Sequence, residues 1–402
     1  MYPDAENVCA SGSMIELSGG AQLRVSDDEK KMRMKKDIKQ LTGLRGVAAC
    51  VVAVSHFDYM QWAPFRFIAF HNVAVDLFFC LSAFTLCLVY NPLDRRTLDL
   101  RAYGIARFAR IYPLYLLGLV FAALTFIRWD FDGYNAYPGS AAMDFLRQLV
   151  MVNALPIVGN GAHWDLPSWS LSVEAFCYIA VFPLLFILAP RASKFPEAGR
   201  LMLILLLTAA AYYMMAKHFD WMIFNPGQVA KDPLAYWALI IRGICSFSAG
   251  WLAYLAWANK DAFSLFAGTN VDAVSVGIFL ILAGTFVGIS AHILLLFVWP
   301  VFIVGLMNER SLTGRALSCR PLVWLGEISY SLYLWHVPVM HLTGKFIPTL
   351  SQSSPLRLAI LSAGSLLMAT ASYSLFEKST RHFIRRALTP VEVARSGTLN
   401  KN

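Results

Sequence analysis

The chain has 402 residues, of which 57% are hydrophobic and 15% are charged, and its mean hydropathy is +0.54. Soluble domains carry roughly 25% charged residues, so this composition excludes an ordinary soluble enzyme. Apolar runs of about 20 residues recur along the chain, and 14% of its residues are aromatic, which indicates a polytopic membrane protein. The composition also excludes a disordered chain, a coiled coil and a nucleic-acid-binding module, so no nucleic-acid partner is expected.

Ten apolar segments are long enough to predict transmembrane helices, although polar residues interrupt several of them. The fold class that we expect is therefore an all-α, polytopic integral membrane protein with about ten transmembrane helices. The predicted spans lie near 42–58, 70–90, 108–127, 168–189, 201–216, 235–257, 271–289, 292–307, 322–342 and 356–376.

The basic residues predict the orientation of these spans, because Lys and Arg concentrate on the cytoplasmic side of a membrane. With the amino terminus in the cytoplasm, the inner segments hold 26 of the 34 Lys and Arg residues and the outer segments hold seven. An even number of spans with both termini in the cytoplasm fits this asymmetry. The net charge of +9 then reflects topology rather than affinity for a polyanion.

The chain divides into three expected regions. Residues 1–40 are polar and basic, with no apolar stretch ahead of a small-residue cleavage site, so we expect a cytoplasmic tail and no cleaved signal peptide. Residues 41–385 form the predicted transmembrane domain, and residues 386–402 form a second cytoplasmic tail. The longest outer loop, near 128–167, is too short for an independent extracellular domain. The chemistry is therefore expected within the membrane.

The cysteines and histidines predict no metal centre. Seven cysteines are present, but no CxxC pair and no Cys/His cluster has the spacing of a zinc site. Neither a disulfide framework nor a bound metal is expected.

The first predicted span carries two ionisable residues, Arg45 and His56, in the sequence LTGLRGVAACVVAVSHF. They are eleven residues apart, which is about three helical turns or roughly 16 Å along nearly the same face. Arg45 is expected near the cytoplasmic surface, where it could bind a phosphate-bearing donor, and His56 lies deeper. A neutral imidazole beside a carboxylate is a suitable general base for a hydroxyl nucleophile. The alternative is that His56 is a hydrogen-bonded packing residue.

Few carboxylates lie in or near the predicted spans, where one could serve as the partner of the His56 imidazole. The possible ones are Asp58, Asp76 and Glu174. Ionisable groups inside spans are costly and therefore indicate a functional site. The structural alternative for Glu174 is an ion pair with Arg45 or Arg242, and for Asp76 it is a helix-start residue favoured by the amino-terminal dipole.

Two further patterns carry polar residues at the membrane. Arg107 and Arg110, in the predicted inner loop RAYGIARFARIYPLYLL, are three residues apart and share a helical face that could bind a polyphosphate. Their alternative role is positive-inside anchoring. In GEISYSLYLWHVPVMH, the aromatic residues predict an interfacial belt with His336 as a polar tip, and a catalytic role for His336 is the alternative.

Taken together, these motifs make the chain resemble the acyltransferase 3 family of polytopic membrane acyltransferases, which includes bacterial O-antigen, exopolysaccharide and Nod-factor acetylases. The resemblance covers about residues 40–385. It rests on five motifs in the family's order: Arg45 through His56, VDLFFCLSAF at 75–84, RFARIYPLYLL at 107–117, PSWSLSVEAFCY at 167–178 and ISYSLYLWHVPV at 328–339.

The resemblance implies that acyl-CoA, usually acetyl-CoA, is the donor substrate, that no cofactor is bound, and that a sugar hydroxyl is a common acceptor. It also implies the site residues: His56 matches the family's essential histidine, Arg45 its partner, Arg107 and Arg110 the arginine pair associated with the CoA phosphates, and Glu174 the glutamate of the WSLSVE motif. Two positions depart from the family pattern. Ala175 replaces a second acidic residue, which argues against paired carboxylates there, and Ala83 replaces a common glycine.

Our interpretation is a membrane-bound acyltransferase that moves an acetyl or other acyl group from acyl-CoA to a hydroxyl of a carbohydrate or lipid-linked glycan. His56 is the predicted general base, with Arg45, Glu174 and Asp76 as further catalytic residues and Arg107 and Arg110 as donor-binding residues. An acyl-histidine intermediate is a variant of this mechanism. The expected location is the bacterial inner membrane.

Two other functions remain open from the sequence. A transporter or flippase would also use intramembrane His, Glu and Arg residues. It differs from an enzyme because it moves a solute across the membrane without changing the solute's mass. A membrane sensor with His56 as a proton switch is the third hypothesis.

Overall fold

The computed structural model describes residues 38–57, 71–129, 141–159, 164–165, 167–218, 234–284, 294–348 and 355–388. Every regular element in these ranges is a helix, which confirms the all-α prediction for the described part of the chain. All structural statements below concern these residues.

The described ranges contain the following helices in chain order. The first half contains α2 (Lys39–His56), α3 (His71–Tyr90), α4 (Leu100–Trp129), α5 (Ala141–Leu149), α6 (Ser168–Phe176), the π-helical turn η3 (Cys177–Val181), α7 (Phe182–Ala192) and α8 (Glu197–His218). The second half contains α10 (Leu234–Asn259), α11 (Ala262–Gly284), α12 (Leu295–Gly305), α13 (Leu312–Leu317), α14 (Arg320–Glu327), α15 (Ser329–Phe346), α16 (Pro355–Ser372), the π-helical turn η6 (Tyr373–Glu377) and α17 (Lys378–Leu388).

Each predicted span corresponds to a helical segment, but only seven helical segments of the described chain are long and apolar enough to cross a membrane. The predicted eighth span is the 11-residue α12, which at 1.5 Å per residue is much too short to cross alone. The predicted ninth span is divided into α14 and α15 at Ile328. The count of ten crossings and the cytoplasmic location of both termini remain predictions.

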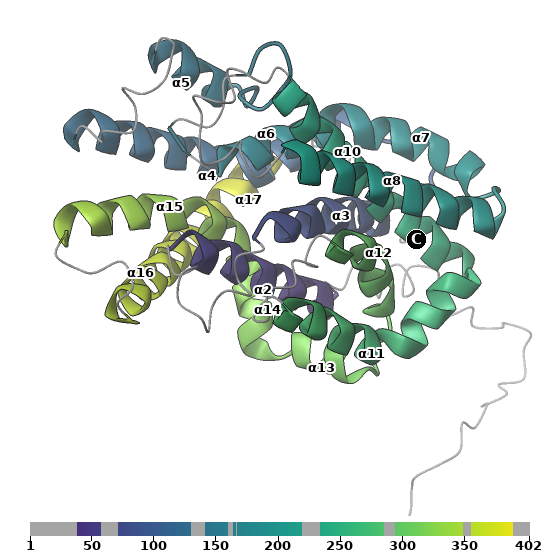
Figure 1. Cartoon of the computed structure of the whole chain (residues 1–402). Helices are drawn as coiled ribbons and strands as arrows, with labels where there is room; N and C mark the ends of the chain where they lie inside the picture. Colours follow the sequence, from purple (N-terminus) through teal and green to yellow (C-terminus); the bar gives the residue numbers. More distant parts are fainter. Residues whose placement is uncertain are drawn as a thin grey trace, which may run out of the picture. The chain divides into compact units, whose positions relative to one another are not determined.

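Burial separates the central helices from the peripheral ones. Along the apolar part of α10, 89% of the residues are buried inside the bundle, against 11% along α11 and 17% along the segment from α16 to α17. α10 packs against α3 and α8, and α2 packs against α3, α14 and α15 (Figure 1). The large apolar side chains exposed on the outer helices, such as Leu206, Phe279 and Leu280, are those expected to face lipid.

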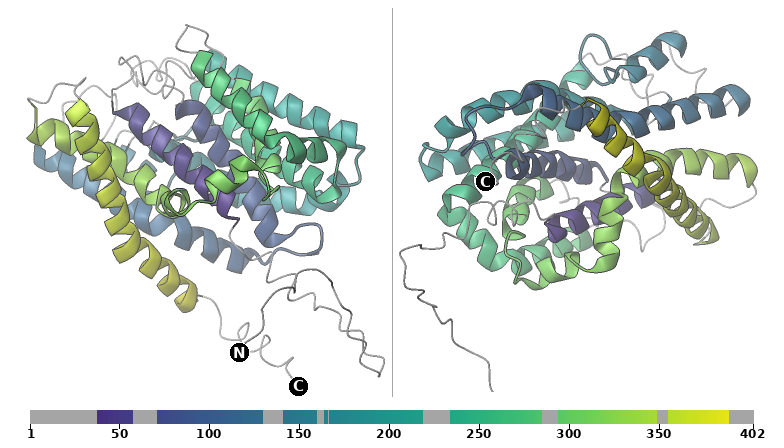
Figure 2. Two further views of the ribbon diagram at one scale, coloured as in Figure 1. Left: turned by 90° about the horizontal axis from the view of Figure 1, so that it is seen from below. Right: turned by 180° about the vertical axis from the view of Figure 1, so that it is seen from behind.

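α4 is longer than the predicted third span, since it begins at Leu100 and runs for 30 residues. The segment that we predicted as an inner loop is therefore the first part of this helix, and Arg107 and Arg110 lie on a rigid element. α16, η6 and α17 form one continuous helical segment whose last part, drawn in yellow, packs against α4 (Figure 2).

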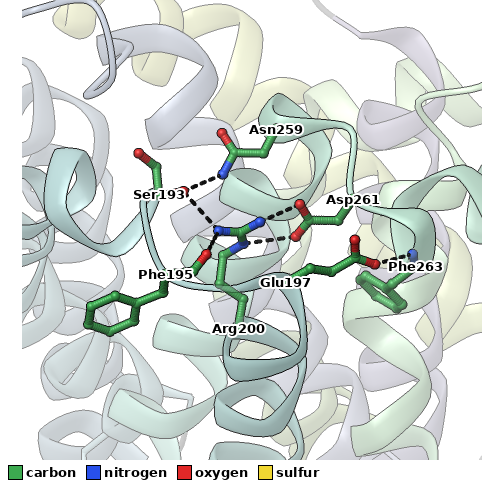
Figure 3. A network of polar contacts seen from close by, with 7 residues as sticks. All are labelled: Ser193, Phe195, Glu197, Arg200, Asn259, Asp261 and Phe263. Carbon is green, nitrogen blue, oxygen red and sulfur yellow. Dashed lines mark hydrogen bonds and ion pairs between the residues drawn. The ribbon is translucent and has the colours of Figure 1, made fainter.

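A buried polar network joins two inter-helix turns at one end of the bundle (Figure 3). Arg200 at the start of α8 forms a two-pronged ion pair with Asp261 and donates to the carbonyl oxygens of Ser193 and Phe195. Asn259 donates to the same Ser193 carbonyl at 3.0 Å. The network satisfies the orphan carbonyls after α7 and ties the α7–α8 turn to the α10–α11 turn.

α2 is held against α14 by a contact that only glycine permits. A Cβ atom added to Gly326 would lie 1.9 Å from the carbonyl oxygen of Thr42, and one added to Gly46 would lie 2.5 Å from the backbone nitrogen of Gly326. Because backbone meets backbone here, no side-chain rotation can relieve such a clash. This close approach sets the position of Arg45, which lies between Thr42 and Gly46 on α2.

We expect Gly326→Ala to destabilise the protein by about 1–3 kcal/mol, because the added methyl group separates α2 from α14. Thermal unfolding of the purified protein in detergent measures this effect. Gly277→Ala on α11 is the matched control, since no atom lies within 4 Å of its Cβ position, and it should be neutral or slightly stabilising. Equal melting temperatures for the two variants would contradict the packing argument.

Candidate active site

A cavity of about 130 Å³ lies between α2, α3, α4, α6 and α15. Four of the residues predicted from the sequence line it: Arg45, Arg107, Arg110 and Glu174. The other polar lining residues are Ser82, Thr85, Ser170, Tyr178, Ser329, Tyr330 and Tyr333. The fold therefore brings the basic pair of α4, the arginine of α2 and the glutamate of α6 to one cavity.

Glu174 lies in this cavity as a hydrogen-bond acceptor. Its Oε1 atom accepts from the Ser82 hydroxyl at 2.7 Å and from the Tyr178 hydroxyl at 2.5 Å. α6 ends two residues later and continues into the π-helical turn η3, which carries Tyr178. π-helical turns are frequent at functional sites, because the extra residue redirects side chains.

His56 lies beside His336, with 4.9 Å between the two ring centroids and an angle of 58° between the rings. His336 is completely buried, and Tyr333 and Trp335 are also buried. The prediction of an interfacial aromatic belt with His336 as a polar tip is therefore wrong, because α15 packs against α2 and α16 inside the bundle.

The two imidazoles share one tautomer. Nδ1 of His56 is 2.8 Å from the Val52 carbonyl oxygen, and Nδ1 of His336 is 2.7 Å from the Tyr333 carbonyl oxygen. A carbonyl oxygen can only accept, so in the neutral ring each Nδ1 carries the hydrogen and Nε2 carries the lone pair. Both rings are thereby oriented by their own helix backbones.

Tyr333 connects the histidines to the cavity. Its ring lines the cavity and lies 5.8 Å from the ring of His336, and its hydroxyl is 2.6 Å from the hydroxyl of Ser170. The histidine pair thus lies behind Tyr333, next to the cavity lining. The sequence did not single out Tyr333 or Ser170 as site residues, although both belong to motifs quoted above.

Asp76 forms a buried ion pair. Both of its oxygens accept from Arg242 of α10, its Oδ1 also accepts from Ser246 at 2.8 Å, and both charged side chains are 1% exposed. The Arg242 guanidinium lies 5.9 Å from the centre of the Trp169 ring. This arrangement differs from the structural alternative considered for Asp76, a helix-start residue, since the ion pair joins α3 to α10. The predicted catalytic role of Asp76 stays a prediction.

The basic residues of the cavity have different surroundings. Arg45 donates to the Gly326 carbonyl at 3.1 Å. Arg110 pairs with Glu377 at 2.9 Å, and the second oxygen of Glu377 accepts from Ser331 at 2.7 Å. Arg107 packs against two tyrosine rings, 5.9 Å from that of Tyr90 and 5.7 Å from that of Tyr178. Glu377 was missed in the sequence because nothing local links it to Arg110, 267 residues away.

Asp165, in the loop before α6, was also missed, because it precedes the predicted span 168–189 and lies outside the quoted motif at 167–178. Its side chain is 1% exposed, and neither carboxylate oxygen has a hydrogen-bond partner among the described residues. Burial raises the pKa of Asp165 to about 7. Asp58, the other carboxylate considered in the sequence, lies outside the described residues. Within the described ranges, no group of three or more His, Cys, Asp or Glu residues could hold a metal ion.

The described chain has apolar helices long enough to span a bilayer, an arginine-lined cavity and an adjacent pair of histidines. These features define a polytopic membrane protein with a candidate site for acid–base chemistry. Residues 38–374 match the acyltransferase domain family known as acyltransferase 3, and the chain belongs to this family.

The chain is similar to peptidoglycan O-acetyltransferase OatA of Listeria monocytogenes, with 26% identity over 374 residues, which is 86% of this chain and 56% of the relative. It is 25% identical over 376 residues to the putative peptidoglycan O-acetyltransferase YrhL of Bacillus subtilis, 87% of this chain and 56% of the relative. Acyltransferase MdmB of Streptomyces mycarofaciens is 32% identical over 157 residues, 37% of this chain and 38% of the relative. The chain therefore spans about half the length of the first two relatives. No solved structure matches it.

We expect Asp76→Asn to lower stability by about 3–5 kcal/mol, because it leaves the Arg242 charge buried without its carboxylate. Thermal unfolding in detergent tests this. The double variant Asp76→Leu with Arg242→Met removes both charges and should regain most of the lost stability. If the double variant is stable and active, Asp76 contributes to activity through packing. If Asp76→Asn is as stable as the wild type, the ion pair does not hold α3 to α10.

Asp165 gives a pH dependence with a defined sign. Its pKa rises from 3.8 in the unfolded chain to about 7 in the fold, so the folded state binds the extra proton and stability falls as pH rises between these values. Asp165→Asn should match the wild type near pH 4 and melt a few degrees higher at pH 8. Asp94→Asn, at an exposed carboxylate, is the control and should show no such divergence. A melting difference for Asp165→Asn that does not change with pH would contradict this account.

Proposed function

We propose that this protein transfers an acyl group, most simply acetyl, from acyl-CoA to a hydroxyl of a carbohydrate or lipid-linked glycan, with His56 as the general base. The observation that carries the proposal is the His56–His336 pair beside an arginine-lined cavity, in a chain that belongs to an acyltransferase family.

The donor end of the proposed site is the arginine-lined part of the cavity. CoA carries phosphate groups, and guanidinium groups bind phosphate through paired hydrogen bonds. Arg107 supports this role because it is held by aromatic rings, and no ion pair to a carboxylate is found for it among the described residues. Arg45 of α2 lines the same cavity and could approach the same group.

The chemical step needs one proton acceptor. Nε2 of His56 takes the proton from the acceptor hydroxyl while the oxygen attacks the thioester carbonyl carbon. A carbon–oxygen bond forms, the carbon–sulfur bond breaks, and the imidazolium returns its proton to the leaving thiolate. His336 supports His56 by packing against its ring. In the acyl-histidine variant, Nε2 itself attacks the thioester carbonyl carbon, the carbon–sulfur bond breaks and the CoA thiolate leaves. The acceptor hydroxyl then attacks the acyl-imidazole, the carbon–nitrogen bond breaks, and the hydroxyl proton passes to the thiolate.

The proposed roles of the two carboxylates differ. Glu174 presents an acceptor oxygen inside the cavity, held by Ser82 and Tyr178, and we propose that it orients the imidazole or a substrate hydroxyl there. For Asp76, the contacts with Arg242 and Ser246 support an indirect role, in which the pair holds the cavity wall formed by α3.

A carbohydrate acceptor is supported by the relatives, two of which are named as peptidoglycan O-acetyltransferases. We further propose ten membrane crossings with both termini in the cytoplasm of a bacterial inner membrane, as the distribution of basic residues predicts. The start of α4 would then face the cytoplasm, where acyl-CoA is made. Family membership favours acyl transfer over the transporter and sensor hypotheses.

The test is transfer of label from radiolabelled acetyl-CoA in membranes that contain equal amounts of inserted wild-type or variant protein. His56→Ala should reduce label transfer to the glycan or lipid fraction by at least about 100-fold, the effect expected for a general base. His341→Ala, on the same helix as His336 but away from the pair, is the control and should retain transfer. Wild-type label transfer by a correctly inserted His56→Ala protein would refute the role of His56, and protein-bound label that hydroxylamine releases would favour the acyl-histidine variant.

A further inference from the structure

The helix α17 adds two arginines to the basic pair of α4. α17 packs against α4, and the charge of Arg381 interacts with those of Arg110 and Glu377. The charge of Arg385 interacts with those of Arg381, Arg107 and Arg110. Arg381 and Arg385 follow Glu377, the partner of Arg110, by about one and two helical turns. Four guanidinium groups from α4 and α17 therefore lie near one another, and two of them, Arg107 and Arg110, line the cavity.

Few negative charges balance the arginine cluster, which consists of Arg107, Arg110, Arg381 and Arg385. Neither α4 nor α17 contains an aspartate or glutamate. Glu377 is the carboxylate that pairs with the cluster, and its two oxygens already accept from Arg110 and Ser331. Neighbouring like charges repel, and the repulsion grows as water is excluded. A bound anion would turn this repulsion into attraction.

The cluster is held in place by surrounding groups. Arg107 lies between the rings of Tyr90 and Tyr178, and Arg110 packs on the ring of Tyr330 at 5.7 Å. Stacking on an aromatic face leaves the N–H edge of a guanidinium available for planar hydrogen bonding to phosphate. Arg381 and Arg385 are one turn apart, so they share a face of α17, and Glu377, one turn before Arg381, pairs with Arg110 of α4.

We propose that α17 completes the donor site, with Arg381 and Arg385 joining Arg107 and Arg110 to bind the phosphates of a nucleotide. This deepens the proposed function, on which it rests, by assigning part of the CoA phosphates to the end of the chain. An anionic lipid headgroup offers the same phosphate chemistry. A different face of α17 is suited to lipid, because Phe383 is exposed there. Arg386 also belongs to that face, since it points about 140° away from Arg381 around the helix. That separation makes Arg386 the matched control.

The experiment compares the full-length double variant Arg381→Gln with Arg385→Gln against Arg386→Gln, assayed with acetyl-CoA and with acetyl-pantetheine, which lacks the nucleotide. We expect the double variant to raise the KM for acetyl-CoA at least tenfold with kcat within about twofold, and to leave acetyl-pantetheine turnover unchanged. Arg386→Gln should behave as the wild type. An unchanged KM, an equal loss with both donors, or the same effect from Arg386→Gln would overturn the proposal.

A binding measurement separates this inference from the proposed reaction. Coenzyme A and adenosine 3′,5′-bisphosphate should stabilise the detergent-solubilised wild type in a thermal shift assay, and the double variant should lose that stabilisation. If wild-type membranes transfer no acetyl group but this binding persists, the proposed reaction fails and the nucleotide site stands. If the double variant instead loses stabilisation only by phosphatidylglycerol vesicles, the arginines bind lipid and the inference fails.

Discussion

A charged side chain in the membrane interior has little water to interact with, so each buried ionic group requires a partner from another part of the chain. In this protein those partners come from far along the sequence: Arg242 is 166 residues from Asp76, and Glu377 is 267 residues from Arg110. The first pair joins α3 to α10, the most buried of the candidate membrane-spanning helices. The second pair joins α4 to η6, and Ser331 adds α15. These contacts form a frame around the cavity, because α3, α4 and α15 all contribute to its walls.

Local departures from regular helix geometry shape the site within this frame. The π-helical turns η3 and η6 carry Tyr178 and Glu377, which hold Glu174 and Arg110 respectively. The glycine contact between α2 and α14 brings Arg45 within reach of the Gly326 carbonyl. Each departure places a polar side chain against a partner that an uninterrupted, evenly spaced helix would not reach.

The candidate site has two chemically different ends. One end gathers arginines beside aromatic rings and can hold phosphate. The other end has two adjacent imidazoles, each oriented by a backbone carbonyl. Tyr333 lies between them, in contact with the cavity and with His336. A donor with a charged nucleotide and a reactive acyl end fits such a division, since binding and proton transfer would then occur at separate places. The arginines of α17 extend the charged end and give the carboxyl-terminal helix a role in the same reaction.

The sequence by itself determined the all-α class, the positions of most membrane helices and the residue types at the site, because apolar run length and motif spacing are local properties. Arg45, Arg107, Arg110 and Glu174 were all singled out in this way, and they line one cavity. Only the tertiary structure decided which charges are paired. It placed Asp76 against Arg242, paired Arg110 with Glu377, buried His336 beside His56 and brought α17 to α4. The physical reason is that pairing between helices depends on which faces meet across the bundle, and a hydropathy pattern records only that a face is apolar, not which helix will cover it.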